Sequence, residues 1–406
     1  MSTEWDAPMP DRPLHGEGAR ILVVDDSDDN RYTLTLYLEL EGYRNIATAN
    51  DGEEAIARLD EDAFDLVLLD VMMPKVDGYQ VLSWLKDQPR LRDLPVIMIS
   101  SLNEMGSVVR CIELGAVDYL LKPFNPVLLK ARLGPTLEKK QLRDQLNAHL
   151  ARLESELAAA RKLQIGMVPH IFPPPSAEWP IDLFAMMEPA REVGGDLYDF
   201  FTLADGRFCF LIGDVSGKGM PAALFMARTK SLVRIATELM RGGDRGLATS
   251  SDIIARVNRE LAENNDDMMF VTMFFAILNP ATGDLEYCNA GHNPPYRLKG
   301  DQLVAVEEPR AIFLGVQADA VYQRGRFSLA PGEMIYLFTD GVTEAQDAGA
   351  TLFSEERLEA VLRRAGGRSS ADLVNAVVAE VSSFVGTAEA SDDITMLALR
   401  RLTEKE

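Results

Sequence analysis

The segment DLVLLDVMMPKVDGYQVL, residues 65–82, decides the fold of the first part of the chain. Its apolar run Leu66–Leu69 is short and ends on Asp70, which is typical of a strand that is buried on both faces of a parallel sheet. Further strand-like runs are Ile21–Val24, Val96–Ile99 and Val117–Leu121, and helical stretches such as Asn30–Leu40 lie between them. This alternation predicts a doubly wound, parallel α/β domain over residues 20–133.

Charged residues stand directly after these runs. Asp25 and Asp26 follow the run ILVV, Asp70 ends its own strand, and Lys122 follows the run DYLL. The carboxyl ends of parallel strands share one edge of the sheet, so three carboxylates and one ammonium group are expected in a single crevice. An Asp after a strand is often only a helix N-cap, but that reading does not explain all four residues together. The set favours Mg²⁺, with Asp70 as a nucleophile that forms an aspartyl phosphate and Lys122 as the partner of the phosphoryl oxygens.

Four stretches of this region resemble the receiver domain of two-component response regulators. They are ILVVDDSDDNR, DLVLLDVMMPKVDGYQVL, PVIMISS and GAVDYLLKPF. The resemblance covers residues 20–133 and implies a phosphodonor of the sensor histidine kinase class. It assigns Asp25, Asp26, Asp70 and the backbone carbonyl of Met72 to the Mg²⁺ site, Asp70 to the phosphoacceptor, Ser100 to the hydroxyl switch position and Tyr119 to the aromatic switch position.

A helical linker is expected over residues 134–170. The positions Leu146, Leu150, Leu153, Leu157 and Ala160 are spaced four and three residues apart in alternation, so they lie on one side of a helix. This seam predicts a parallel coiled-coil homodimer; the alternative is a solvated amphipathic helix that lies on its own domain. A break or kink is expected at Gly134–Pro135, because proline lacks a backbone donor and disfavours helix in the residue before it.

The sequence changes character after the Pro-rich segment His170–Pro180, which marks a domain boundary. Strand-like runs are Phe208–Ile212, Thr272–Leu278, Leu285–Asn289, Met334–Phe338 and Ile394–Leu399, and helical patterns occupy Ala222–Met240 and Ser251–Glu263. The pattern predicts a second domain of the α+β class over residues 171–402.

Acidic residues also flank the apolar runs of this second domain. They are Asp196, Asp214, Asp340, Asp392 and Asp393, and most of them stand next to glycines. Each alone is readable as a turn residue, but the whole set is better explained as a cluster of oxygen ligands for Mg²⁺ or Mn²⁺. Two such ions can hold a phosphate and lower the pKa of a bridging water, which then attacks phosphorus.

These stretches resemble the SpoIIE/RsbU-like branch of the PPM family of metal-dependent Ser/Thr phosphatases. The matching motifs are ARKLQIGMVP, EVGGDLYDF, GDVSGKGMPAALFMA, NAGHNPP, FTDGVTEA and SDDITMLALR. The resemblance implies an αββα sandwich and a centre of two Mn²⁺ or Mg²⁺ ions. It assigns Asp214 to the bridging position, Asp196 and the Val215 carbonyl to one ion, and Asp340 and Asp392 to the other, with Asp393 beside the metal ligands. Gly is usual where Val215 stands. A structural role is favoured for His292 over a catalytic one.

The composition excludes some function classes. Lys and Arg total 41 against 63 Asp and Glu, so the formal net charge of the 406 residues is -22. Phosphates would be repelled by such a chain, which argues against nucleic-acid and anionic-membrane partners. Cys111, Cys209 and Cys288 stand in apolar contexts, as core cysteines of a reducing compartment do, and no apolar stretch reaches the about 18–20 residues of a membrane helix. Residues 1–19 are expected to be a disordered tail of a cytoplasmic protein.

The sequence thus predicts a response regulator whose aspartyl phosphorylation controls a metal-dependent protein Ser/Thr phosphatase. By resemblance, the substrate is a phosphorylated STAS-type anti-anti-sigma protein in a partner-switching pathway. The alternative is a non-catalytic adaptor that binds a protein partner when the receiver is phosphorylated, which the completeness of the second carboxylate set disfavours. A DNA-binding output is disfavoured because the second half is acidic and lacks a basic recognition helix.

Overall fold

The computed structural model describes residues 18–88, 92–101, 110–176, 178–240 and 248–403. The predicted disordered tail, residues 1–19, lies outside these ranges except for its last two residues. The chain divides into two compact units, of which one ends at Leu153 and the other begins at Glu154. Each unit is described by itself.

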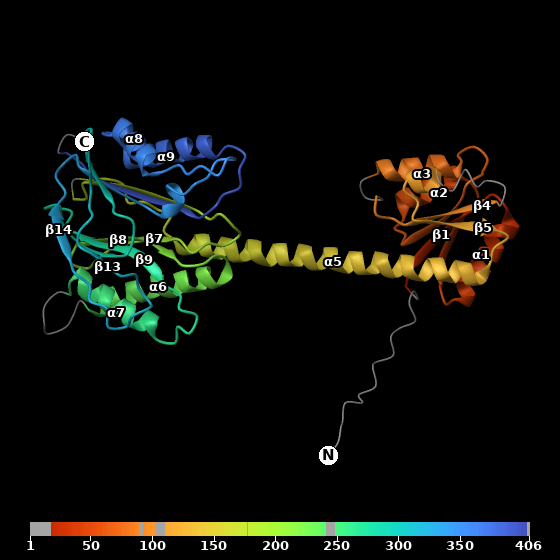
Figure 1. The fold of residues 1–406 in the computed structure, drawn as a ribbon, viewed down its shortest axis with the longest axis horizontal. Helices are drawn as coiled ribbons and strands as arrows, with labels where there is room; N and C mark the ends of the chain where they lie inside the picture. The colour runs from red at the N-terminus through yellow and green to blue at the C-terminus, as the bar shows by residue number, and fades with distance from the viewer. Residues whose placement is uncertain (1–17, 89–91, 102–109, 177, 241–247, 404–406) are drawn as a thin grey trace, which may run out of the picture. The chain divides into compact units, whose positions relative to one another are not determined.

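The first unit contains a five-stranded parallel sheet with the strand order β2-β1-β3-β4-β5 (Figure 1). Its elements are β1 (Arg20–Val24), α1 (Asp28–Leu40), β2 (Asn45–Ala49), α2 (Gly52–Glu61), β3 (Leu66–Asp70), α3 (Gly78–Asp87), β4 (Val96–Ser101) and β5 (Asp118–Lys122). Helices cover both faces of the sheet, because alternate strand residues enter two separate cores. Leu22 and Leu69 pack on the side of α2 and α3, whereas Ile21 and Leu68 pack on the side of α1. The predicted doubly wound α/β fold is confirmed.

Helix α5 (Pro126–Met167) is the longest element of the described chain. The side chain of Asn125 accepts hydrogen bonds from the backbone of Val127 (2.9 Å) and Leu128 (3.2 Å), which caps the start of the helix. The predicted break at Gly134–Pro135 is absent, since the helix continues through both residues. The proline ring normally clashes with the Cβ of the preceding residue when that residue is helical. The preceding residue here is Gly134, which has no Cβ.

The second unit contains two sheets. Its elements are β6 (Ile181–Glu188), β7 (Leu197–Thr202), β8 (Phe208–Val215), α6 (Met220–Leu239), α7 (Ser250–Ala262), β9 (Val271–Leu278), β10 (Asp284–Ala290), β11 (Tyr296–Lys299), β12 (Gln302–Ala305), β13 (Arg310–Ala311), β14 (Gly325–Ser328), β15 (Met334–Phe338), the 3-10 helix η2 (Asp340–Val342), α8 (Glu355–Ala365), α9 (Ser370–Val385) and β16 (Ile394–Arg401). One sheet has the order β13-β10-β9-β8-β7 with β14 paired to β10, and the other has the order β12-β11-β15-β16-β6.

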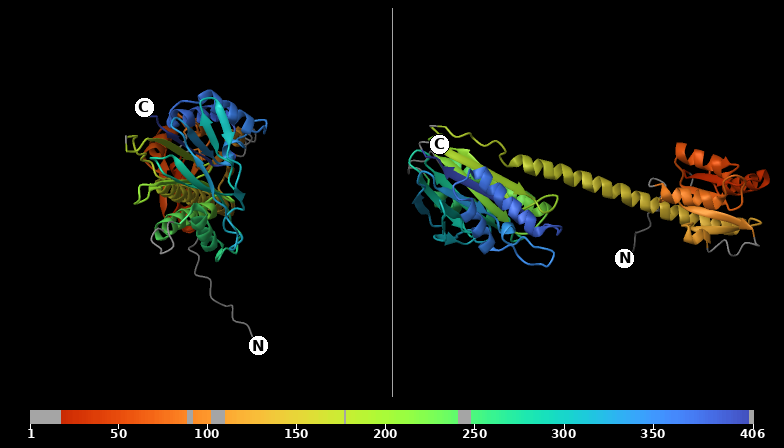
Figure 2. Two further views of the ribbon diagram at one scale, coloured as in Figure 1. Left: turned by 90° about the vertical axis from the view of Figure 1, so that its left-hand side faces the viewer. Right: turned by 90° about the horizontal axis from the view of Figure 1, so that it is seen from above.

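The two sheets form the centre of a four-layer sandwich. Side chains such as Phe210, Phe274 and Leu397 fill the space between the sheets. Helices α6 and α7 pack on the outer face of the β7–β10 sheet, and α8 and α9 pack on the outer face of the β15–β16 sheet (Figure 2). Strand β8 contributes to both cores, since Phe210 faces the other sheet while Leu211 faces the helices. The expected αββα arrangement is confirmed.

The cysteines are buried, and none of the three is in a disulfide. Burial raises the pKa of the Cys288 thiol to about 12, so this group stays protonated and unreactive at neutral pH. Their expected role as small core residues agrees with this environment.

Candidate metal centres

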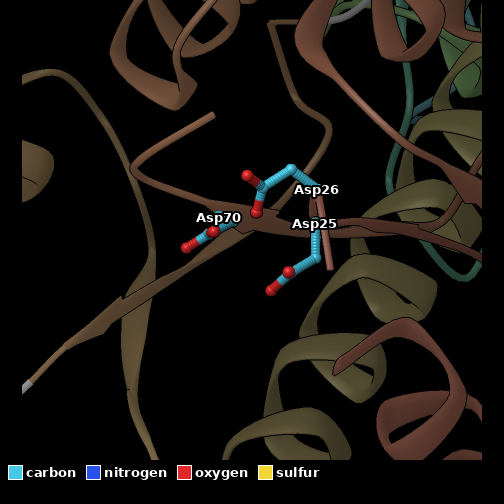
Figure 3. Close-up of side chains that lie close together, drawn as sticks. All are labelled: Asp25, Asp26 and Asp70. Atoms are coloured by element: carbon cyan, nitrogen blue, oxygen red, sulfur yellow. The ribbon is translucent and has the colours of Figure 1, made fainter. Parts of the chain in front are cut away.

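Three carboxylates of the first unit lie together at the carboxyl edge of its sheet. Asp25 and Asp26 follow β1 and Asp70 ends β3, and one carboxylate oxygen from each lies within 4.8 Å of the others. Figure 3 shows the three carboxyl groups side by side at these strand ends. Asp25 and Asp70 are buried, whereas Asp26 is exposed and leaves the group open to solvent. Hard oxygen donors in this number fit Mg²⁺.

Lys122 is the nearest counter-charge. Its Nζ lies 2.8 Å from Oδ2 of Asp25 and 2.9 Å from Oδ2 of Asp70. Burial lowers the pKa of Lys122, but the hydrogen bonds to Asp25 and Asp70 outweigh it, so the pKa rises and the ammonium stays charged. Burial raises the pKa of Asp70 to about 6, and the charge of Asp25 adds to that effect, against the hydrogen bond from Lys122. One ammonium group does not fully offset three carboxylates, and a divalent cation would complete the neutralisation.

The other predicted receiver residues lie on β4, on β5 and in the loop after β3. Ser100 is buried in β4, one residue beyond Ile99, which pairs with Asp70. Tyr119 lies on the adjacent strand β5 and is half-buried. Met72 lies in the loop after β3 with its side chain largely exposed, so a contribution from this residue falls to its backbone carbonyl.

Two features of this loop were not predicted from the sequence. A Cβ at Gly78 would lie 2.1 Å from the backbone oxygen of Asp70, so only glycine permits this close approach. Lys75 has a positive φ of 65° and its Nζ lies 2.6 Å from Oδ2 of Asp51, which caps α2. The loop after Asp70 is therefore held against α2 as well as against its own strand.

Five acidic residues of the second unit stand at strand ends. Asp196 precedes β7, Asp214 lies at the end of β8, Asp340 follows β15, and Asp392 and Asp393 precede β16. Strands β7 and β8 are paired in one sheet, and β15 and β16 are paired in the other. Thr339 joins the two sheets at this end, because its Oγ1 donates a hydrogen bond of 2.8 Å to Oδ2 of Asp196.

The charges of these carboxylates act on one another, although among the described residues only Asp25, Asp26 and Asp70 bring three carboxylate oxygens within 4.8 Å of one another. Burial, followed by the charges of Asp340, Asp392 and Asp393, raises the pKa of Asp214 to about 7. Burial and the charges of Asp214 and Asp393 raise the pKa of Asp196 well above its usual value. Burial and nearby acidic groups raise the pKa of Asp340 as well. Asp196 is buried, and Asp214, Asp340, Asp392 and Asp393 are half-buried. Carboxylates whose charges oppose one another are stabilised by cations between them, so oxygen donors of this kind suit divalent metal ions.

Asp393 has a distinct position in this group. Its Oδ2 accepts hydrogen bonds from the backbone of Gly195 (2.7 Å) and Asp196 (3.4 Å), and its Oδ1 accepts one from Ala190 (2.8 Å). A Cβ at Gly194 would lie 2.0 Å from Oδ2 of Asp393, which explains the glycine there. These bonds hold the loop that carries Asp196.

Backbone oxygens and glycines complete the environment. A Cβ at Gly195 would lie 2.7 Å from the backbone oxygen of Val215, so glycine lets this carbonyl stand close to the Gly195–Asp196 turn. A Cβ at Gly341 would lie 1.9 Å from the backbone oxygen of Asp393. Val215 stands where the resemblance led us to expect glycine. Its side chain is buried in the core beneath α6.

His292 is buried and tied into the backbone of its own turn. Its Nδ1 lies 2.9 Å from Oγ1 of Thr272, and the side chain of Asn289 bonds both its N–H (2.8 Å) and its carbonyl (3.1 Å). Burial lowers the pKa of His292 to about 3, so the ring is neutral. Thr272 in turn donates to the backbone oxygen of Asp214 at 3.4 Å. These contacts agree with the favoured structural role.

Lys218 and Gln164 were not singled out by the sequence reasoning. The Nζ of Lys218 lies 2.8 Å from Oδ2 of Asp392 and donates to the backbone oxygen of Ser391 at 2.6 Å. It places a cation beside the carboxylates, where the sequence offered no obvious arginine. Gln164, at the end of α5, is hydrogen bonded to Gly194. Both residues belong to quoted motifs, but nothing in the motifs indicates what they contact.

Comparisons with known proteins assign both units. Residues 21–134 match the response regulator receiver domain, and residues 204–402 match the Stage II sporulation protein E (SpoIIE) family. The chain joins a receiver domain to a SpoIIE-type phosphatase domain. Asp214, Asp340, Asp392 and Asp393 lie within the second match, whereas Asp196 and Gln164 precede it.

Three curated proteins are similar to parts of this chain. Protein IcfG of Synechocystis is 30% identical over 286 residues, which is 66% of this chain and 44% of that protein. Phosphoserine phosphatase RsbU of Bacillus subtilis is 29% identical over 250 residues, 61% of this chain and 71% of RsbU. Response regulator PleD of Caulobacter vibrioides is 43% identical over 128 residues, 32% of this chain and 28% of PleD. The chain therefore spans less than half the length of IcfG and of PleD.

A solved structure supports the fold of the second unit. The SiaA PP2C domain of Pseudomonas aeruginosa superposes with a TM-score of 0.54 at 21% identity and covers 62% of this chain and 98% of that domain. Among the described residues, we find no helix with the length and apolarity required to cross a bilayer.

Asp214→Asn should stabilise the metal-free protein at high pH. A folded-state pKa of about 7 for Asp214, above its ordinary value, means that the native state binds more protons than the unfolded state. The free energy of unfolding therefore falls as the pH rises from about 4 to 7, and the neutral amide removes this loss. In chelator at pH 8 the variant should melt above the parent protein, and the difference should shrink toward pH 4.

The matched control is Asp319→Asn, which removes an exposed carboxylate of the same unit and should leave the melting temperature unchanged. With excess Mn²⁺ the parent protein should have a higher melting temperature than Asp214→Asn, because Mn²⁺ binding to the native state stabilises the parent protein more. A variant that melts lower than the parent protein in chelator at pH 8 would contradict the repulsion argument.

Proposed function

We propose that phosphorylation of Asp70 controls a Mn²⁺- or Mg²⁺-dependent phosphatase that hydrolyses phosphoserine or phosphothreonine in proteins. The observation that carries this proposal is the carboxylate group at one end of the sandwich. Asp196, Asp214, Asp340 and Asp392 come from four strand ends. The raised pKa values of Asp196, Asp214 and Asp340 reflect burial and neighbouring negative charge, which divalent cations would offset. The description of RsbU as a phosphoserine phosphatase supports the same reaction class.

We assign the residues of this group to the two cations as follows. Asp214 would be the bridging carboxylate; burial and then the charges of Asp340, Asp392 and Asp393 raise its pKa. Asp196 and the Val215 carbonyl would hold one cation, and Asp340 and Asp392 the other. The cations would bind the phosphate and lower the pKa of a water that attacks phosphorus. The carboxylates would orient these groups, and Lys218 adds a positive charge at the rim.

The receiver half would accept a phosphoryl group from a sensor histidine kinase. A carboxylate oxygen of Asp70 attacks phosphorus, an acyl phosphate forms, and the donor's histidine leaves. Lys122, which already contacts Oδ2 of Asp70, would pair with the new phosphoryl oxygens. Ser100 and Tyr119 would report the change on the neighbouring strands β4 and β5.

We further propose that the substrate is a phosphorylated STAS-type anti-anti-sigma protein in a cytoplasmic partner-switching pathway. The support is the similarity to the SpoIIE family and to RsbU. The decisive experiment is a Mn²⁺-dependent assay of phosphate release from candidate phosphorylated STAS proteins, with and without prior phosphorylation of the receiver. Tight binding of these proteins without phosphate release would favour the adaptor alternative.

The active form is proposed to be a homodimer joined by α5. Leu146, Leu150 and Leu153 are 57%, 49% and 54% exposed, although leucines at this spacing form an apolar seam along one side of the helix. A second copy of the same helix is the partner that offers a complementary seam in register. Leu157 and Ala160, the next seam positions, are already half-buried in the single chain.

Asp214→Asn should abolish Mn²⁺-dependent phosphate release from a phosphoserine peptide while the fold persists. An amide is neutral and does not bridge two cations as a carboxylate does. The loss should be on the order of 100-fold or more, because removal of groups that merely support a metal ligand already costs about 10–100-fold. Asp319→Asn should keep full activity, and full turnover by Asp214→Asn would exclude the two-cation mechanism.

Asp70→Asn should block labelling of the receiver by radioactive acetyl phosphate. The amide is a poor nucleophile, and the change also removes a metal ligand. Asp29→Asn, at an exposed carboxylate in the first turn of α1, is the control and should be labelled like the parent protein. Stoichiometric labelling of Asp70→Asn would identify another acceptor.

The double variant Leu150→Lys, Leu157→Lys should dissociate the dimer and uncouple phosphatase activity from receiver phosphorylation, because two charges per chain would enter the seam. Sedimentation equilibrium measures the first effect. Ala148→Lys with Ser155→Lys adds the same charge on exposed positions away from the seam and should stay dimeric. Regulation that survives in a proven monomer would rule out the coiled-coil mechanism.

A further inference from the structure

The side chain of Gln164 is bonded twice to one backbone residue. Its Nε2 donates to the backbone oxygen of Gly194 at 2.5 Å, and its Oε1 accepts from the backbone nitrogen of Gly194 at 3.0 Å. Gln164 is only 4% exposed, so both bonds are shielded from water. The paired geometry fixes the orientation of the amide, because each of its ends faces the matching backbone group. The side chain thus satisfies both backbone hydrogen-bonding groups of Gly194, as a paired strand does for its neighbour.

The residue held in this way begins the loop that carries Asp196. Gly195 and Asp196 donate their backbone N–H groups to Oδ2 of Asp393. The loop is therefore held from one direction by Gln164 and from another by Asp393. A displacement of about 1 Å at Gly194 would break hydrogen bonds of this length and shift the carboxylate of Asp196.

Two other contacts link the last turns of α5 and the residues just after it to the segments on either side of this loop. Nη1 of Arg161 donates to the backbone oxygen of Arg191 at 2.9 Å, and the hydroxyl of Tyr198 donates to the backbone oxygen of Pro169 at 2.8 Å. Gln164 differs from both because its side chain bonds one backbone residue in both directions, as donor and as acceptor. It lies outside the residues matched by either domain family, 21–134 and 204–402.

We propose that Gln164 is a positioning residue through which the end of α5 sets the place of Asp196 and hence the metal affinity of the phosphatase centre. This inference rests on the proposed function. A rotation or shift of this helical segment carries the Gln164 amide with it, and the Gly194 backbone follows or loses both bonds. The position of α5 thereby determines whether Asp196 stands where it can share a cation with Asp214.

The test uses the full chain with two substitutions. Gln164→Glu keeps the shape but replaces the donor that faces the Gly194 oxygen with a carboxylate oxygen, and Gln164→Met keeps the volume but removes both bonds. The control, Gln141→Glu, makes the same chemical change at an exposed position of the same helix. The dissociation constant of Mn²⁺ is measured from the electron paramagnetic resonance of free Mn²⁺, without reference to activity.

Both Gln164 variants should bind Mn²⁺ at least about 10-fold more weakly than the parent protein, in the range seen when support of a metal ligand is lost. Phosphate release should recover at saturating Mn²⁺, so the apparent constant for the metal changes while kcat does not. Hydrogen exchange at residues 190–197 should accelerate. Gln141→Glu should match the parent protein in each measurement.

An unchanged Mn²⁺ dissociation constant in both folded Gln164 variants would overturn the inference. If Gln164→Glu fails to fold, Gln164→Met decides the question, and hydrogen exchange over the rest of the second unit establishes that it is folded. The result also separates the two proposals. Loss of Mn²⁺ binding in Asp214→Asn together with unchanged binding in both Gln164 variants would reject only the role of Gln164, whereas unchanged binding in Asp214→Asn would reject the proposed metal centre.

Discussion

Negative charge gathered at strand ends is the constraint on which both units depend. In the first unit, three carboxylates share one edge of a parallel sheet, and a single lysine offsets part of their charge. In the second, the carboxylates stand where two sheets meet, and burial raises the pKa of Asp214 to about 7. Like charges in a poorly solvated site raise the free energy of the folded protein, and a divalent cation reverses the sign of that term.

The two scaffolds gather carboxylates by different means. A parallel sheet brings its strand ends to one edge through chain direction alone, so Asp25 and Asp70 meet because β1 and β3 are neighbours. The sandwich has no such rule, since its strands run in both directions within each sheet. There the site depends on contacts between sheets, such as the bond from Thr339 to Asp196, and on glycines that let loops approach closely.

The helix between the units has different surroundings along its length. Leu129, Leu133 and Leu137 pack into the core of the receiver, and Gln164 is buried beside the loop of Asp196. Between these two ends lie exposed leucines at coiled-coil spacing. The same helix thus packs into a core near its start, is exposed in its middle and is hydrogen bonded near its end.

Several strands could be predicted from single segments of the sequence. The run Met334–Phe338 is observed as β15 with the predicted bounds, and Val117–Leu121 is displaced by one residue as β5 (Asp118–Lys122). Continuous apolar runs specify buried strands locally, which is why these predictions succeed. The break expected at Gly134–Pro135 is absent, because Gly134 has no Cβ for the proline ring to clash with and α5 continues through both residues.

The sequence by itself determined the two domains and many of their strands, and it singled out the candidate carboxylates, because these follow from short patterns of residue type. Only the tertiary structure decided how those carboxylates are held. Asp393 bonds the backbone of Gly195, 198 positions away, and Gln164 bonds Gly194, 30 positions away. Such partners leave no local pattern, because a hydrogen bond between a side chain and a distant backbone depends on the path of the chain and not on the spacing of residues.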